Sequence, residues 1–595
     1  MKNLLTGNEA IVQGAWEAGV KFASAYPGTP SSEILANFVH FEKDMKGEWA
    51  PNEKVSLEAA IGASIGGVRS LCAMKHVGVN VAADPLFTFS YTGVNGGMVL
   101  ITADEPGQHS SQNEQDNRWY AVSAKLPMYE PSDSQEAKDM MIAGYELSEA
   151  YDSPVLMRVT TRICHSKSIV DCGPRQDIAD KKYEKNPAKY LMVPAMARDR
   201  RVVVEDRMNK LKEFTETTPW NRIVPSKNGK KIGVVVSGMC YNFAREVFGD
   251  DAAYLKLGFT NPLPDKLLAK FYETVDEVYV IEENDPYLEN WIKSQGFAVK
   301  GKDVFPAYGE MTADVLRMAL HGEELPSIQY DDSIVVGRPP TLCAGCPHRG
   351  FFYELAKMKD VAISGDIGCY TLGFAPPYNA MDTCVVMGGA FSIAHGMQKA
   401  FDISGQSTRA IGVLGDSTFF HTGINSLMEI YYNDSKAISV ILDNRITGMT
   451  GQQENPGSGK LLGGAKAKVM DIVDIVKAIG FKHIFVINPN DLTAMKKALK
   501  DAMALDEASV IITVWPCVLK NMDEEELGEF NNPFTKKYEI IADKCISCKL
   551  CIKCGCPAIS MDKGTNKAVI DRPQCVGCDV CAQICPKDAI VQEGK

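Results

Sequence analysis

Nine of the 18 cysteines lie between residues 545 and 585, and they form two spaced groups. The second group has the spacing C-x2-C-x2-C-x3-C-P and comprises Cys575, Cys578, Cys581, Cys585 and Pro586. This spacing allows three thiolates on one tight loop to bind three irons of a cubane, while the fourth cysteine reaches across to another cubane. The sequence therefore predicts a small C-terminal module built around two [4Fe-4S] clusters.

The first group has one cysteine more than a cluster needs. Its sequence, CISCKLCIKCGCP at residues 545–557, places the Cys-Pro pair at Cys556–Pro557, one residue later than usual. Because proline follows the crossing ligand in the second group, we assign Cys556 to that role and leave Cys554 as a bystander. The predicted ligands are Cys545, Cys548, Cys551 and Cys585 for cluster 1, and Cys575, Cys578, Cys581 and Cys556 for cluster 2.

Two zinc sites are the alternative interpretation of these cysteines. Zinc sites need four ligands without the Cys-Pro signature, and they usually include histidine, which is absent from residues 537–595. The module instead resembles a bacterial two-cluster ferredoxin, which implies that it moves electrons one at a time. The remaining chain is therefore expected to produce or consume electrons.

Composition excludes several classes of function. The 595 residues include 63 basic and 75 acidic side chains, a net charge of −12, which argues against nucleic acid as the main partner. No stretch approaches the roughly 20 apolar residues of a membrane span, and the N-terminus lacks the apolar core of a signal peptide. Cysteines without a secretion signal indicate reduced thiols or metal sites. We expect a soluble cytoplasmic protein.

The pattern of apolar residues predicts an α/β fold with several domains. Short β-branched runs alternate with amphipathic helices, which is typical of parallel sheets covered by helices. Breaks in composition divide the chain into predicted segments at 1–185, 186–230 (a linker), 231–330, 331–517, 518–536 (an acidic, then Asn/Pro-rich linker) and 537–595.

The stretch IGVLGDSTFF, residues 411–420, carries the clearest cofactor signal. Gly415, Asp416 and Ser417 follow an apolar strand, and a second strand ends at Asp443 and Asn444. Glycine at a strand end lets backbone N–H groups face a phosphate, and Asp416, Asn444 and the Ile446 carbonyl could hold Mg²⁺. The arrangement resembles the diphosphate motif of thiamine diphosphate enzymes, although Ser417 and Asp443 depart from the usual Gly and Asn.

Thiamine diphosphate enzymes also require a carboxylate that hydrogen-bonds the aminopyrimidine. The helix-like stretch NEKVSLEAAIGASIGG, residues 52–67, offers Glu53 and Glu58. Glu53 has Gly62 nine positions later, as in thiamine enzymes, whereas Glu58 lies too close to that glycine and is expected on the solvent side. A solvated helix face is the plain alternative for either residue. We favour Glu53 as the carboxylate that activates the cofactor.

Over essentially its whole length the chain is similar to the 2-oxoacid:ferredoxin oxidoreductases. YPGTPSSEI at 26–34 resembles the family's Tyr-Pro-x-Thr-Pro substrate loop, which implies that Thr29 contacts the substrate carboxylate. YLKLGFTNPLPDKLLAKF at 254–271 resembles its transketolase C-terminal-like domain. The implied order is a pyrimidine domain (1–185), the transketolase-C domain (231–330), a diphosphate domain (331–517) and the ferredoxin module. Segments 110–121 and 160–166 resemble a subfamily's own segments, without an assigned role.

The resemblance also implies cofactors and partners beyond the tail clusters. A third cluster near the thiazolium would use a C-x2-C pair, a Gly-Cys and a Pro-Cys, which match Cys343, Cys346, Cys369 and Cys517. A zinc half-site or buried thiols are the alternatives. The family's gamma-type domain is not found in the chain, so a separate small (beta) subunit, an α2β2 assembly and an anaerobic cytoplasm are implied. Coenzyme A is the implied cosubstrate and ferredoxin the electron acceptor.

We therefore expect the catalytic alpha subunit of an oxidoreductase that converts aryl 2-oxo acids, such as indolepyruvate and phenylpyruvate, to aryl-acetyl-CoA, CO2 and reduced ferredoxin. One alternative is an enzyme for pyruvate or branched-chain 2-oxo acids. A second is an electron-transfer subunit that has lost catalysis. A third, decarboxylation to an aldehyde without redox chemistry, is disfavoured by the two-cluster tail.

Overall fold

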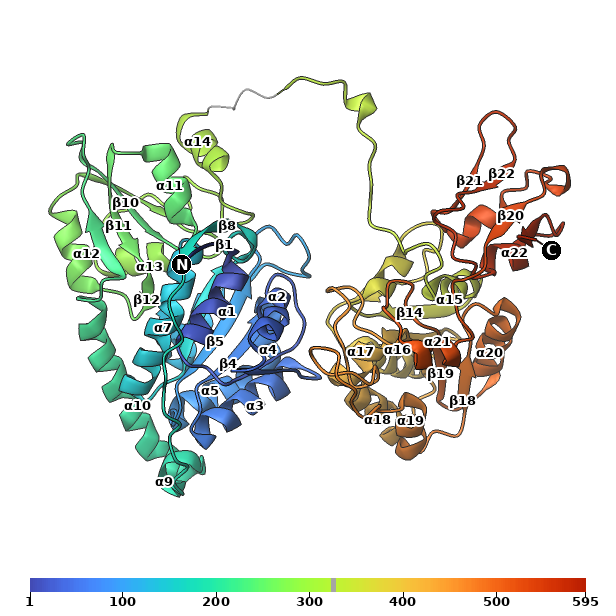
Figure 1. Cartoon of the computed structure of the whole chain (residues 1–595), viewed down its shortest axis with the longest axis horizontal. Helices are drawn as coiled ribbons and strands as arrows, with labels where there is room; N and C mark the ends of the chain where they lie inside the picture. The colour runs from blue at the N-terminus through green and yellow to red at the C-terminus, as the bar shows by residue number, and fades with distance from the viewer. Residues whose placement is uncertain (323–327, 595) are drawn as a thin grey trace. The chain divides into compact units, whose positions relative to one another are not determined.

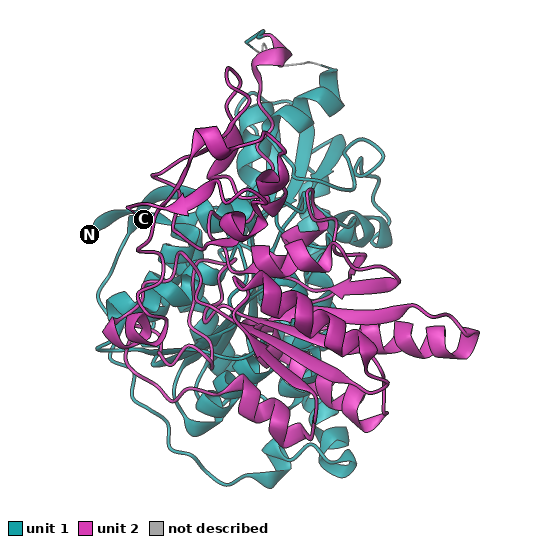
Figure 2. Ribbon diagram, turned by 90° about the vertical axis from the view of Figure 1, so that its right-hand side faces the viewer, with its two compact units in different colours: residues 1–330 teal, residues 331–595 magenta. Residues whose placement is uncertain are grey.

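The computed structural model describes residues 1–322 and 328–594. The chain divides into two compact units, Met1–Tyr330 and Asp331–Lys595, which are coloured separately in Figure 2. Residues 323–327 of the predicted third segment and Lys595 of the predicted tail lie outside the described residues. Among the residues described, no helix combines the length and apolar character needed to cross a bilayer.

Unit 1 is built on a seven-stranded sheet with the order β12-β6-β7-β5-β4-β2-β3. All neighbouring pairs are parallel except β12 and β6. Helices α1 (Gly7–Glu17), α3 (Glu53–Gly66) and α7 (Ser134–Tyr151) belong to this half of the chain (Figure 1). The strands are β2 (Phe22–Ala25), β3 (Lys46–Trp49), β4 (Ser70–Lys75), β5 (Met98–Asp104), β6 (Met128–Tyr129), β7 (Val155–Thr160) and β12 (Phe259–Asn261).

A second, four-stranded sheet in unit 1 has the order β13-β10-β11-β9. Strands β10 (Ile232–Ser237), β11 (Ala252–Leu257) and β13 (Glu277–Ile281) are parallel, and β9 (Asn221–Val224) is an antiparallel edge. The segment expected to be a linker is therefore structured, since it holds β9 and the helix α10 (Pro194–Thr215). The buried Arg207 of α10 donates to the carbonyl of Ser90, 2.7 Å away.

Strand β12 shows that the predicted segments 1–185 and 231–330 contribute to one sheet. It lies beyond residue 231 in the chain, yet it adds an edge to the first sheet. The side-chain amide of Asn261 donates to the carbonyls of Ala121 and Leu126, at 3.1 and 2.6 Å. The ring of Phe259 packs edge-on against Tyr129. These contacts explain why the strand joins the first sheet.

Unit 2 contains a six-stranded parallel sheet with the order β15-β14-β16-β17-β19-β18. Its four central strands pair with neighbours on both sides, and their apolar side chains form much of the core of this unit. Together with the first sheet of unit 1, it confirms the predicted α/β class. The strands are β14 (Val361–Gly365), β15 (Thr383–Cys384), β16 (Arg409–Gly415), β17 (Ile438–Asp443), β18 (Ile484–Ile487) and β19 (Ser509–Val514).

The cysteine-rich end of unit 2 is a small module with little regular structure. Two antiparallel ribbons pair β20 (Tyr538–Ile540) with β23 (Ile590–Gln592) and β21 (Ile559–Met561) with β22 (Ala568–Ile570). A short helix, α22 (Val580–Ile584), completes it, and the buried side chains include several cysteines. The preceding acidic segment carries the short helix α21 (Glu524–Glu529).

Candidate functional site

Helix α3 of unit 1 carries both candidate glutamates, and it buries the side chain of Glu53 and exposes that of Glu58. Asn52 caps α3 by accepting the N–H of Val55 at 2.9 Å, which places Glu53 in the first turn. The Glu53 side chain is buried against Gly78 of α4 (His76–Val81), where an added Cβ would come within 2.8 Å of its Oε1. Glu58 is exposed and pairs with Lys54. Only glycine at position 78 leaves room for the Glu53 carboxylate.

The predicted substrate loop follows strand β2, at the carboxyl end of the seven-stranded sheet of unit 1. Gly28, next to the half-buried Thr29, packs against the Lys75 side chain, with an added Cβ at 3.4 Å. Lys75 ends the adjacent strand β4, and its Nζ lies 3.6 Å from Glu105 and 3.2 Å from the carbonyl of Ser110. Burial lowers the pKa of Lys75, and the negative charges of Glu105 and Glu53 oppose this shift.

Sequence reasoning missed Lys75. The available signal was a lysine that closes an otherwise apolar strand, SLCAMK, whose neighbour β2 runs into the Thr29 loop. In a parallel sheet the carboxyl ends of adjacent strands lie side by side, so the two features could have been connected.

The two segments without an assigned role frame this edge of the sheet. In 110–121, the amides of Gln115 and Asn117 both donate to the carbonyl of His76, at 3.0 and 3.2 Å. In 160–166, His165 lies 3.7 Å from Glu33, which follows the Thr29 loop in α2 (Ser32–Ala36). The hydrogen bond with Glu33 raises the pKa of His165. The first segment therefore holds α4, which packs against Glu53, and the second contacts α2, which follows Thr29 in the chain.

In unit 2, Gly415, Asp416 and Ser417 lie where β16 turns into a helix. Gly415 packs against the ring of Tyr370, so that an added Cβ would be 2.6 Å from a ring carbon. Asp416 is buried, and its Oδ2 accepts a hydrogen bond from Asn455 at 2.9 Å. Burial, reinforced by the nearby Asp443 carboxylate, raises the pKa of Asp416 to about 7. A divalent cation here would stabilise both ionised carboxylates.

The next strand supplies further oxygen atoms beside Asp416. Strands β16 and β17 are parallel neighbours, with Gly415 opposite Leu442, so Asn444 follows one strand end as Asp416 follows the other. The Asn444 Oδ1 accepts the N–H of Ile446 at 3.1 Å, which folds the loop back over this edge. Carboxylate, amide and carbonyl oxygens are the donors that Mg²⁺ prefers. The predicted Mg²⁺ ligands thus fit that ion.

The four cysteines considered for a third cluster converge on the same edge. Burial raises the pKa of Cys369 to about 11, and the nearby Cys517, Cys343 and Asp416 add to this rise. Cys346 is also buried and interacts electrostatically with Cys369 and Cys517. The N–H of Cys517 donates to the carbonyl of Asn444 at 3.0 Å. The thiols lie beside the predicted Mg²⁺ ligands.

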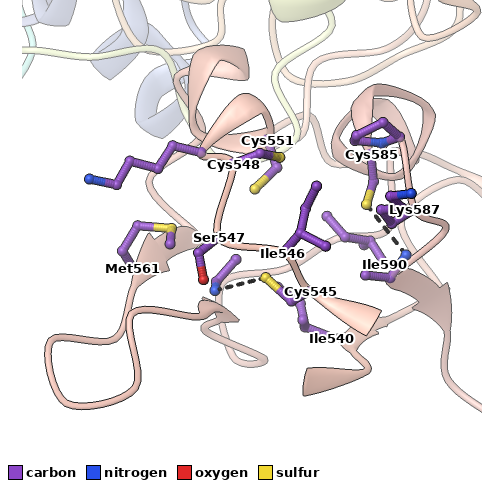
Figure 3. Close-up of a pocket in the computed structure, with 14 residues that line it drawn as sticks. Ile540, Cys545, Ile546, Ser547, Cys548, Cys551, Met561, Cys585, Lys587 and Ile590 are labelled. Atoms are coloured by element: carbon purple, nitrogen blue, oxygen red, sulfur yellow. Dashed lines mark hydrogen bonds between the residues drawn. The ribbon is translucent and has the colours of Figure 1, made fainter. Parts of the chain in front are cut away.

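In the tail, the four predicted ligands of cluster 1 line one cavity (Figure 3). Its remaining wall is largely apolar and includes Ile540, Ile546, Met561 and Ile590. Backbone N–H groups of Ala568 and Ala589 donate to the sulfurs of Cys545 and Cys585, at 3.5 and 3.3 Å. Hydrogen bonds from N–H groups to cysteine sulfurs are among the contacts that set the reduction potential of a bound cluster. Neither Cys554 nor Cys556 belongs to this cavity lining.

The predicted cluster 2 ligands also lie close together, but Cys554 lies among them. Burial raises the pKa of Cys578 to about 12, and Cys556, Cys554 and Cys575 reinforce the rise. Cys554 is almost fully buried, whereas Cys556 is partly exposed. The choice of Cys556 over Cys554 as the crossing ligand stays a prediction.

Zinc sites are the alternative to cubanes for these cysteines. Among residues 1–322 and 328–594, no group of three or more His, Cys, Asp or Glu is arranged to hold a single metal ion. A single zinc ion draws its thiolates together at about 2.3 Å each, while a cubane spreads them over different irons. The choice of [4Fe-4S] clusters over zinc stays a prediction.

The cluster 2 side of the tail packs on the parallel-sheet domain of unit 2. The buried Arg349 donates to the carbonyls of Cys343 and Cys554, at 2.8 and 3.3 Å, and to that of Leu342. The Tyr378 hydroxyl donates to the same Cys554 carbonyl at 2.6 Å. Gly345 lies against Val576, where a Cβ would clash at 2.0 Å. The loop that carries Cys343 and Cys346 thus touches the loop of cluster 2.

Two family models match separate parts of the chain. Residues 13–219 match the family model of the pyruvate flavodoxin/ferredoxin oxidoreductase thiamine diphosphate-binding domain. Residues 366–513 match that of the C-terminal thiamine pyrophosphate-binding domain of thiamine pyrophosphate enzymes. The two predicted halves of the cofactor site fall within these matches. They define the class as a thiamine diphosphate-dependent oxidoreductase.

Relatives that match over the whole length of this chain narrow the class to one family. The indolepyruvate oxidoreductase subunit IorA of Pyrococcus abyssi is 38% identical over 100% of this chain and 97% of its own. That of Methanothermobacter thermautotrophicus is 39% identical over 100% and 98%. A solved 2-oxoglutarate:ferredoxin oxidoreductase from Magnetococcus marinus aligns with a TM-score of 0.44 at 17% identity, covering 50% of this chain and 61% of its own. The chain belongs to the IorA family of indolepyruvate oxidoreductase subunits.

Proposed function

We propose that the chain is the catalytic alpha subunit of an enzyme that oxidises aryl 2-oxo acids to aryl-acetyl-CoA. One 2-oxo acid, one coenzyme A and two oxidised ferredoxins give one acyl-CoA, one CO2, two reduced ferredoxins and two protons. The observation that carries the proposal is the set of groups gathered in unit 2: buried oxygen atoms, four thiols beside them and a cysteine-rich module in contact with the loop that carries Cys343 and Cys346. The names of the full-length relatives support the aryl substrate.

Thiamine diphosphate, when bound, supplies the carbon nucleophile for decarboxylation and passes two electrons on singly. In the proposal Glu53 hydrogen-bonds the aminopyrimidine from a buried position, so its carboxylate is shielded from bulk water. Asp416, Asn444 and the Ile446 carbonyl hold Mg²⁺, and Gly415 and Ser417 leave backbone N–H groups for the diphosphate. Thr29 binds the substrate carboxylate, and we add Lys75 as the nearby positive charge.

The proposed electron path follows the contacts within unit 2. Cys343, Cys346, Cys369 and Cys517 hold a third cluster beside the Mg²⁺ ligands. Cluster 2 receives electrons next because its loop, at Val576, touches Gly345 between the first two of these cysteines. Cluster 1 is last. The buried guanidinium of Arg349 supports this assignment, because its hydrogen-bond acceptors within residues 1–322 and 328–594 are all neutral and it lies near Cys346 and Cys554. Anionic clusters would supply its counter-charge.

The proposed assembly is α2β2, with a smaller gamma-type subunit that completes the coenzyme A step and ferredoxin as the acceptor. The test is anaerobic, CoA-dependent reduction of methyl viologen by the natively purified complex. Indolepyruvate, phenylpyruvate, pyruvate and 2-oxoisovalerate are compared as substrates. We expect preference for the two aryl acids. Preference for pyruvate or 2-oxoisovalerate would keep the reaction and refute the aryl assignment, and inactivity with all four would favour an electron-transfer subunit.

A further inference from the structure

The tail module has a covered side and an open side. The side with Val576 and the Cys554 carbonyl packs on the sheet domain of unit 2. On that side Gln583 also accepts the N–H of Leu492 at 3.0 Å and donates to the carbonyl of Asn490 at 2.7 Å. The mouth of the cluster 1 cavity, in contrast, presents exposed residues. Electrons that reach cluster 1 can therefore leave there without passing another element of unit 2.

The open side combines an apolar centre with unpaired positive charge. Ile546 is 55% exposed beside the exposed Cys548. Lys549 and Lys587 line the same cavity and are exposed, and neither forms an ion pair within the described part of the chain. Residues 537–595 contain nine basic and seven acidic side chains, although the whole chain carries a net charge of −12. The positive rim is thus a local feature of an acidic protein.

We propose that Ile546, Cys548, Lys549 and Lys587 form the docking face, here called the exit face, for a small one-electron carrier protein with an acidic surface. The inference rests on the proposed function, which makes cluster 1 the last cluster. Charge complementarity selects the occupant, because lysines around an exposed redox group attract and orient an acidic partner. A patch of this size suits the small interfaces of transient redox encounters. One electron passes per encounter, so that cluster 1 is oxidised as the carrier's cluster is reduced.

The test compares two double charge reversals in the natively purified complex. Lys549→Glu/Lys587→Glu alters the exit face. Lys496→Glu/Lys500→Glu is the matched control, with the same change in net charge on exposed positions of helix α20 (Leu492–Ala504). Each variant is assayed at low ionic strength with an acidic two-cluster ferredoxin and, separately, with methyl viologen, which needs no protein docking face. Iron content and subunit composition are measured in parallel.

We expect the exit-face variant to raise the KM for ferredoxin roughly tenfold and to flatten its salt dependence. Its viologen rate should stay within about twofold of the unmodified complex, and the control should change neither. An unchanged KM, or an equal rise in the control, overturns the proposal. So does loss of the small subunit, because the face would then be a subunit interface.

If the charge reversal lowers the iron content, Lys549→Gln/Lys587→Gln replaces it. We expect the KM for ferredoxin to rise about threefold in that variant, and an unchanged KM again overturns the proposal. Inactivity of the unmodified complex with viologen would refute the proposed function instead, which keeps the two failures distinct.

Discussion

Replacement of Arg349 by Met tests how the tail is joined to the rest of unit 2. The Arg349 side chain is 1% exposed and donates to three carbonyls, those of Leu342, Cys343 and Cys554. No carboxylate pairs with it in the described part of the chain. Its positive charge therefore lies between the Cys343–Cys346 loop and the segment that leads to Cys556, with neutral acceptors only.

The size of the effect follows from the acceptors left behind. In Arg349→Met the Leu342 and Cys343 carbonyls lose their side-chain donor, while the Cys554 carbonyl keeps Tyr378. Each buried carbonyl without a donor costs about 1–3 kcal/mol, so the contact should weaken by about 2–6 kcal/mol. Tyr378→Phe removes two hydrogen bonds, the one that the hydroxyl donates to the Cys554 carbonyl and the one that it accepts from Arg349, and should cost about 1–3 kcal/mol. Arg349→Lys keeps the charge and loses the forked geometry.

Because Arg349 is positively charged, the cost of replacing it should also depend on whether the clusters are bound. A buried, unpaired cation is itself costly, so in cluster-free protein its removal offsets part of the lost hydrogen bonding. With clusters bound, each iron–sulfur core together with its thiolates carries a net negative charge, and the cation becomes favourable. We therefore expect Arg349→Met to be much more harmful in the cluster-loaded protein, and Arg349→Lys to recover part of the difference.

Hydrogen exchange over residues 342–349 and 549–557 measures this contact directly, because local opening free energies set the protection of backbone amides. Ferredoxin reduction should slow in the same order, with Arg349→Met affected more than Tyr378→Phe. Unchanged protection in cluster-loaded Arg349→Met would refute the role of Arg349 in holding the tail. An equal loss with and without clusters would refute the counter-charge argument alone.

Four further changes test other parts of the site. Cys554→Ala should leave the iron content of the tail unchanged, and loss of a whole cluster would move the crossing ligand from Cys556 to Cys554. Asp416→Asn should weaken Mg²⁺-dependent binding of thiamine diphosphate at least about tenfold in calorimetric titration, whereas equal affinity with and without Mg²⁺ in the unmodified protein would argue against the metal site. Lys75→Met should raise the KM for the 2-oxo acid by about tenfold or more, the value of a lost charge-assisted hydrogen bond, and an unaltered KM would exclude Lys75 from carboxylate binding. Burial raises the pKa of Glu283 from 4.5 to about 7, so the native state holds this proton more tightly and the stability of the unmodified protein falls as pH rises between these values. Glu283→Gln should therefore gain up to about 3 kcal/mol relative to the unmodified protein at about pH 8 and little below about pH 4.5, and thermal melts with the same difference at both pH values would contradict this linkage.

Much of the fold could be predicted because its signals are local. Runs such as AISVILDN are apolar over a strand's length, which indicates strands buried on both faces of parallel sheets. Asp416 and Asn444 could be placed together because each directly follows such a strand. Strand β9, in contrast, was missed because NRIV is only four residues long and is followed by proline. Strand β12 joins a sheet whose other strands precede residue 161, and no local pattern encodes that distant pairing.

The irregular spacing of the first cysteine group has a physical explanation that the sequence alone could not supply. The extra residue lies in the turn formed by Cys554 and Gly555, and this turn faces the sheet domain of unit 2. The Cys554 carbonyl accepts hydrogen bonds from Tyr378 and Arg349. Gly555 has φ of +65°, and an added Cβ would meet Pro377 and Tyr378 at 3.0 Å.

The contact therefore uses the backbone of Cys554 and the small size of Gly555. A backbone carbonyl can be supplied by any residue, whereas a positive φ in a crowded turn favours glycine. The thiol of Cys554 is thus not needed for docking, and its role as a bystander stays a prediction. The insertion lengthens the loop towards the domain that holds Cys343 and Cys346, on the side where electrons would enter the tail.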